Sequence, residues 1–190
     1  CQILFQNISP AIDPSIFHQN NIVALRNIHQ LILPRDQKPQ HQVTPKEQAQ
    51  IAEENQRKRA QCHQLIQLNF EILVESLLQV INRSVQILNE GKYQDNNLCN
   101  LTIEILTYVV KQNYKIQVSQ GNDCQNIERF RDDILGAALG AYSPASVQQN
   151  QTLTNQVAED LMEQIMMCSQ LDFISSTLEP LLRVEQPPRL

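Results

Sequence analysis

Side chains that ligate metals are few in this chain of 190 residues, and they do not occur at ligand spacing. A protein-bound zinc ion needs His, Cys or carboxylate ligands in short spacings such as C-x-x-C or H-x-x-x-H. The sequence has neither pattern, and its only adjacent pair, Cys62 and His63, would point in different directions from a helix. We therefore predict no metal site. The histidines are interpreted as solvated side chains: His18, His29, His41 and His63.

Nucleophilic and acid–base catalysis are not indicated either. An activated serine commonly lies in a G-x-S-x-G turn and phosphate loops are rich in glycine, but the chain has only four glycines and neither motif. Glu71 and Glu75 are four residues apart, which is common on surface helices and does not make an acid–base pair. Glu104 stands within an apolar run, although helical geometry could equally turn it to solvent. We predict no catalytic residue and no cofactor, and an enzyme without a recognisable motif is the second alternative.

Charge and hydropathy argue against two classes of partner. The net charge is −5 and the only basic cluster is Arg57–Arg59, whereas a nucleic-acid binder needs a basic face. No apolar run approaches the roughly 20 residues that span a bilayer. The five cysteines are odd in number and adjoin apolar residues, which indicates buried free thiols and a cytoplasmic location. Because the chain begins with Cys1, an exported protein that has lost its signal segment is the alternative.

The spacing of apolar residues predicts an all-α fold, an irregular helical bundle of about five to six helices in a single domain over residues 1–190. Apolar side chains recur at helical intervals, glycine is scarce, and prolines and capping residues divide the chain. Residues 114–118 alternate as a strand does but have no partner strand, so they are expected to form an extended linker. The expected helices cover about 15–32, 44–91, 97–112, 123–141, a segment that Thr154 caps, and a final segment from Asp172 to about 181.

The longest expected helix begins at Thr44 and ends near Gly91. Thr44 is suited to the N-cap, Pro45 to the first helical position, and Glu47 completes a capping box. No proline or glycine follows before Gly91, so an unbroken helix would be about 65–70 Å long at 1.5 Å per residue. Its continuity is weakest across Arg59–His63.

The two halves of this long helix differ in composition. Residues 65–88 are apolar over a wide arc and are expected to be central to the core. Residues 34–60 are expected to be an exposed loop and a polar half-helix that projects from the bundle. Such a shape suits the docking of a partner, through a contact surface of Ala49, Ile51, Ala52, Arg57, Lys58 and Arg59.

These observations favour a non-catalytic protein-interaction module, such as an adaptor, a regulator or an accessory subunit of a larger assembly. The expected partner is another protein, with self-association left open. The alternative is a bundle that binds a small hydrophobic ligand or pigment, because the apolar arc of 65–88 is unusually wide. Gly136 and Gly140 are four residues apart among alanines, which predicts close helix packing there.

Overall fold

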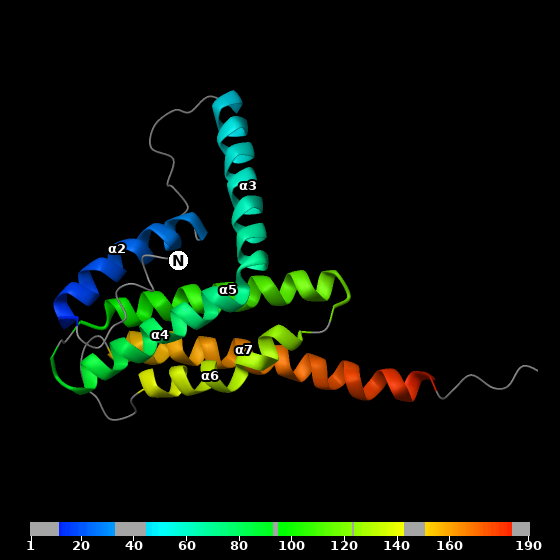
Figure 1. The fold of residues 1–190 in the computed structure, drawn as a ribbon. Helices are drawn as coiled ribbons and strands as arrows, with labels where there is room; N and C mark the ends of the chain where they lie inside the picture. Colours follow the sequence, from blue (N-terminus) through cyan, green and yellow to red (C-terminus); the bar gives the residue numbers. More distant parts are fainter. Residues whose placement is uncertain (1–11, 33–44, 93–94, 123, 143–150, 184–190) are drawn as a thin grey trace, which may run out of the picture.

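The computed structural model describes residues 12–32, 45–92, 95–122, 124–142 and 151–183, and side chains within these ranges except Leu31, residues 45–47, Arg59 and residues 169–183. These ranges contain six helices and no strand, so the predicted all-α bundle is confirmed (Figure 1). The described part does not include Thr44, Asp123 or the side chains of Glu47, Arg59 and Asp172. The helices are α2 (Pro14–Ile32), α3 (Pro45–Leu68), α4 (Phe70–Asn89), α5 (Asn97–Ser119), α6 (Gln125–Ala141) and α7 (Gln151–Arg183).

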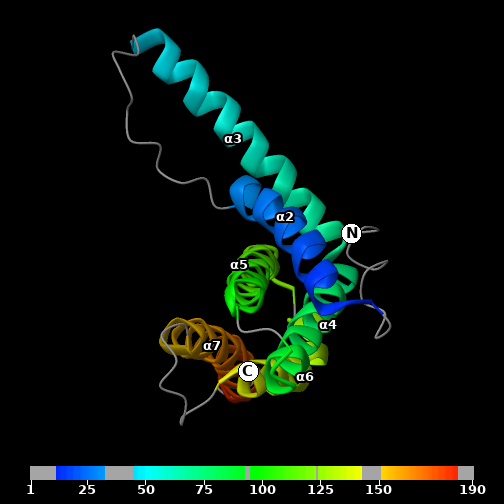
Figure 2. The same cartoon turned by 90° about the vertical axis from the view of Figure 1, so that its left-hand side faces the viewer.

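Helix α5 lies at the centre of the bundle and contacts each of the other five helices. Figure 2 shows it with α2, α4 and α7 around it. Its inward face is buried along most of its length, from Leu98 to Asn113. The helix runs on to Ser119, so the extended linker predicted for residues 114–118 is wrong. Tyr114 packs against the core, which outweighs the strand preference of its neighbours.

The predicted single helix over 44–91 is also wrong, because the chain bends by 85° between α3 and α4. The break lies at Asn69 and not across Arg59–His63, which is helical. Asn69 has a non-helical φ of −123° and ψ of 20°. Its side-chain amide nitrogen donates a hydrogen bond to the Leu65 carbonyl oxygen at 2.9 Å. The bend allows Ile66 and Phe70, on either side of it, both to be buried.

Helix α4 ends at Asn89, close to Gly91 as expected. The glycine has a φ of +66°, a conformation that costs glycine little, and its amide donates to the Leu88 carbonyl. The apolar face of α4 packs on α5 and α6. Its buried side chains include Phe70, Leu73, Val74, Leu77, Leu78, Val80, Ile81 and Ile87.

The C-terminal part is one helix of 33 residues and not the two that were predicted on either side of Asp172. Its start also differs, because α7 begins at Gln151 and Thr154 lies inside it with 1% of its surface exposed. The Thr154 hydroxyl accepts a hydrogen bond from Asn96 at 3.1 Å, which joins α7 to the start of α5. A continuous inward face holds the helix against α5 and α6: Val157, Leu161, Ile165 and Cys168.

The cysteines of the described part are free thiols. Cys99, Cys124 and Cys168 are buried, as predicted, whereas Cys62 is half-buried. Cys1 lies outside the described residues. The three buried thiols therefore pack in the hydrophobic core as small apolar side chains.

Candidate functional site

Helix α3 leaves the bundle as an arm (Figure 1). Every described side chain from Gln48 to Gln61 is exposed, and the helix first becomes buried at Ile66, near its C-terminal end. The charged side chains of the arm pair along the helix: Lys58 Nζ lies 2.7 Å from Glu54 Oε1, and this hydrogen bond lowers the pKa of Glu54. The arm thus presents about four helical turns to solvent between Gln48 and Gln61, at 3.6 residues per turn.

The predicted docking residues do not share one face of this arm. Ala49, Ile51, Ala52, Arg57 and Lys58 are all exposed, and the side chain of Arg59 lies outside the described part. At about 100° of rotation per residue, Ala49 lies about 160° around the helix from Ile51. Ala49 and Ala52 therefore cannot form one contact stripe with Ile51.

A different stripe runs along α3 with the alternating three- and four-residue steps of a coiled-coil seam. We call it the α3 seam, and its large apolar members are exposed by 49% at Ile51, 61% at Leu65 and 73% at Leu68. Leu65 and Leu68 were expected in the core, but the bend at Asn69 leaves them outside it. The complete seam is Ile51, Glu54, Lys58, Gln61, Leu65 and Leu68.

A second candidate site is a groove of about 310 Å³ between α2, α5 and the start of α7, which we call the α2–α5 groove. His29 Nε2 of α2 lies 3.2 Å from Glu104 Oε2 of α5, and the two side chains are 22% and 38% exposed. Glu104, the charge that the sequence singled out, therefore has a partner, and His29 is not the solvated side chain that was expected. The lining residues are Ile22, Arg26, His29, Gln30, Asn97, Asn100, Leu101, Glu104 and Leu153.

Asn100 distinguishes this groove from an ordinary surface depression. It is only 4% exposed, and neither its amide nitrogen nor its amide oxygen has a hydrogen-bond partner. Asn96, one turn earlier on α5, is also buried, but its amide donates to Thr154 and Gln151. Asn113 is unpartnered as well but does not line this groove. Sequence reasoning missed Asn100 because Asn is abundant in this chain and its burial depends on how α2 and α5 pack.

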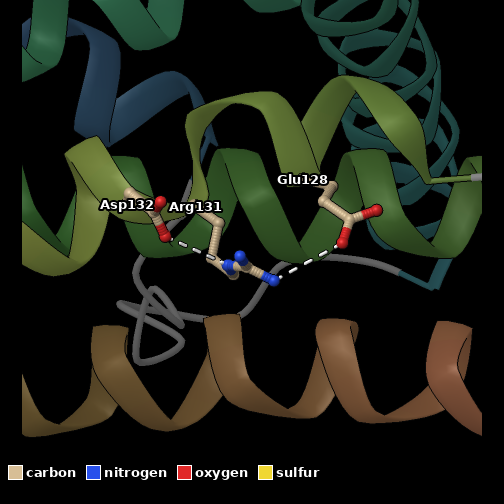
Figure 3. A network of polar contacts seen from close by, with 3 residues as sticks. All are labelled: Glu128, Arg131 and Asp132. Atoms are coloured by element: carbon tan, nitrogen blue, oxygen red, sulfur yellow. Dashed lines mark hydrogen bonds and ion pairs between the residues drawn. The ribbon is translucent and has the colours of Figure 1, made fainter.

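Helix α6 carries a network of charges, shown in Figure 3. Arg131 Nη1 lies 3.4 Å from Glu128 and its Nε lies 3.2 Å from Asp132. Asp132 also borders a wider groove of about 520 Å³ between α4 and α6. Solvent-exposed ion pairs of this kind contribute about 0–1 kcal/mol, and the described residues include no group of three or more metal-ligating side chains. We interpret the network as surface stabilisation of α6.

The expected close packing at Gly136 and Gly140 is not found among the described residues. Both glycines are exposed, and a Cβ at Gly136 would meet no atom within 4 Å. At Gly140 the nearest atom is Cγ1 of Val85, at 4.0 Å. The neighbouring alanines make the contact instead, with Ala137 and Ala138 buried against the core.

Among the described helices, none alone is both long and apolar enough to cross a membrane, and only the bent pair of α3 and α4 reaches that length and composition when its two helices are taken together. Comparison with known proteins finds no match: no family model, no curated protein and no solved structure is similar to this chain. Its function must therefore be argued from the arm and the groove themselves.

Proposed function

We propose that this chain is a non-catalytic protein-interaction module whose docking element is the α3 seam. The observation that carries the proposal is the arm itself, in which every described side chain from Gln48 to Gln61 is exposed while the helix continues into the core at Ile66. Most helix stability in proteins comes from packing, and the exposed part of α3 buries no side chain against the bundle. A contact with a partner would supply that packing.

The partner that fits the seam is an amphipathic helix. Ile51 at one end and Leu65 with Leu68 at the other are exposed apolar anchors, and the seam between them is polar. A helix laid along the seam would bury these anchors at about 25 cal/mol per Å² of apolar surface. The matching helix is apolar at both ends and polar in the middle.

The charges of the seam favour a helix of a different protein over a second copy of this chain. Parallel pairing of two copies would place Glu54 against Glu54 and Lys58 against Lys58, and like charges at a seam are unfavourable. Antiparallel pairing that brings Ile51 against Leu68 would place Glu54 against Leu65, which leaves a carboxylate beside an apolar side chain. A different helix can place polar or opposite charges at these levels, so the proposed role is that of an adaptor or accessory subunit. The cytoplasmic location remains a prediction.

A photocrosslinking amino acid placed at position 51 tests the proposal in the cells that make the protein. The matched control is the same amino acid at Leu139 of α6, which is exposed by 60% but lies away from the arm. We expect a distinct protein to crosslink at 51 and not at 139, and the crosslink to map to an amphipathic helix of that protein. The captured protein is then purified and its binding is measured directly.

Substitutions decide whether that binding uses the seam. Leu65→Asp is expected to weaken binding by at least about tenfold, which corresponds to about 1.4 kcal/mol. Leu139→Asp, at a position of nearly the same exposure, is expected to leave binding unchanged. Equal effects of the two substitutions, or equal crosslinking at 51 and 139, would contradict the proposal. Sedimentation that shows self-association abolished by Leu65→Asp would contradict the choice of a different protein as the partner.

A further inference from the structure

We propose that the α2–α5 groove is a ligand site for a small carboxylate that also carries an amide-type donor–acceptor edge. In this site Arg26 binds the carboxylate and Asn100 binds the amide edge. The inference is independent of the α3 seam, which lies on a different helix.

The side-chain amide of Asn100 indicates the amide edge of the ligand. A buried donor or acceptor without a partner is costly, so buried amides are almost always satisfied. Asn100 is 4% exposed, lines the groove, and has neither its nitrogen nor its oxygen bonded. The group that would satisfy both atoms presents a hydrogen-bond acceptor and a donor side by side, as a primary amide does.

The charged side chains of the groove indicate the carboxylate of the ligand. The Glu104 carboxylate lies 3.2 Å from His29 Nε2, so it already has a polar partner in the groove wall. Arg26, one turn before His29 on α2, also lines the groove and forms no ion pair with a described residue. Arginine binds carboxylates through paired N–H donors. Arg26 is therefore the side chain of the groove wall that can bind a carboxylate.

Size and apolar lining define the body of the ligand. The groove volume of about 310 Å³ is at the lower end of the range for small-molecule sites. Ile22, Leu101 and Leu153 supply apolar walls from three helices. A short methylene chain between the carboxylate and the amide fits this lining.

Three probes with five carbons each separate the contributions. Glutaramate carries both a carboxylate and a primary amide, pentanoate carries only the carboxylate, and pentanamide carries only the amide. Titration of the purified chain, followed by amide chemical shifts, is expected to show glutaramate binding at least about tenfold more tightly than either of the others. Shift changes are expected around Arg26, His29 and Asn100.

Two variants assign each half of the ligand to its residue. Asn100→Ala is expected to bring glutaramate to the affinity of pentanoate, and Arg26→Gln is expected to bring it to the affinity of pentanamide. Arg129→Gln removes an exposed arginine that lies outside this groove, and it should change none of the three affinities. Three probes of equal affinity, no shifts with glutaramate, or unchanged discrimination in Asn100→Ala would overturn the proposal.

The stability of the free protein supplies a second measurement. Asn100→Leu keeps a similar shape but removes the unpartnered donor and acceptor, so we expect its Tm without any probe to rise by about 2–4 °C. The same variant should no longer distinguish glutaramate from pentanoate. A lower Tm would mean that the amide is already satisfied in the free protein, and would also overturn the proposal.

Discussion

The ring of Phe130 stands edge-on to the ring of Phe70, with centroids 6.3 Å apart and planes at 73°. Phe70 is the first residue of α4 and Phe130 lies in the middle of α6, and each is less than 5% exposed. The Arg129 guanidinium lies 5.5 Å from the centre of the Phe130 ring and 3.0 Å from Glu71. The contact between the two rings joins the start of α4, next to the bend at Asn69, to α6.

Phe130→Ala should therefore be strongly destabilising. Truncation of a buried phenylalanine costs about 3–5 kcal/mol, and the aromatic pair adds to this loss. Urea unfolding followed by circular dichroism measures the difference. Arg129→Ala, at the adjacent exposed position, should cost less than about 1 kcal/mol because it removes only a solvent-screened ion pair and ring contact. Similar losses in the two variants would show that the Phe70–Phe130 contact does not hold the two helices together.

The bend at Asn69 should be a stable feature of the free protein. Spin labels at Ile51 and Asn82, in a background without the half-buried Cys62, would be about 46 Å apart along a straight helix at 1.5 Å per residue. With the 85° bend we expect a separation of about 35 Å. Asn69→Ala should retain the short distance, because Ile66 and Phe70 remain buried on either side of the bend. A main population near 46 Å would contradict a fixed arm.

The spacing of apolar residues predicted the positions of the helices more accurately than it predicted which helix faces are covered by neighbouring helices. The wide apolar arc of residues 65–88 correctly indicated that Phe70 and Leu77 are buried. It also placed Leu65 and Leu68 in the core, because a pattern of spacing shows which residues share a face but not whether a neighbouring helix covers that face. The bend depends on the packing of Ile66, which no local signal reveals.

The α2–α5 groove depends even more on tertiary packing. Glu104 could be singled out as a charge in an apolar run, but its partner His29 is 75 positions away and on another helix. Nothing in the sequence indicates that α2 and α5 are neighbours. The burial of Asn100 likewise follows from that pairing and not from its own segment.

His18 should titrate below the ordinary histidine range. Burial lowers the pKa of its imidazole, which outweighs the attraction of Asp95 at 3.5 Å, and Arg26 lowers the pKa further. Because the unfolded chain then takes up its proton at a higher pH than the folded one, stability should fall as the pH drops below about 6.5. Imidazole chemical shifts measure the midpoint. Asp95→Asn should lower that midpoint and Arg26→Gln should raise it, and a midpoint above 6.5 in the native protein would contradict this account.

Cys99 should make the protein less stable in alkali. Burial raises the pKa of its thiol from 9.0 to about 12, so between these values the unfolded chain loses a proton that the folded chain keeps. Stability is therefore fully present below pH 9 and falls above it, by up to about 1.4 kcal/mol per pH unit for this one group. The free energy of unfolding of Cys99→Ala should fall less between pH 8 and pH 10 than that of the native protein, whatever the substitution costs at pH 8.

Alkylation is a second measurement of the same shielding. In the native protein Cys62, which is half-buried, should be alkylated well before Cys99. Equal slopes for the two proteins, or early alkylation of Cys99, would show that its thiol is not shielded by the core.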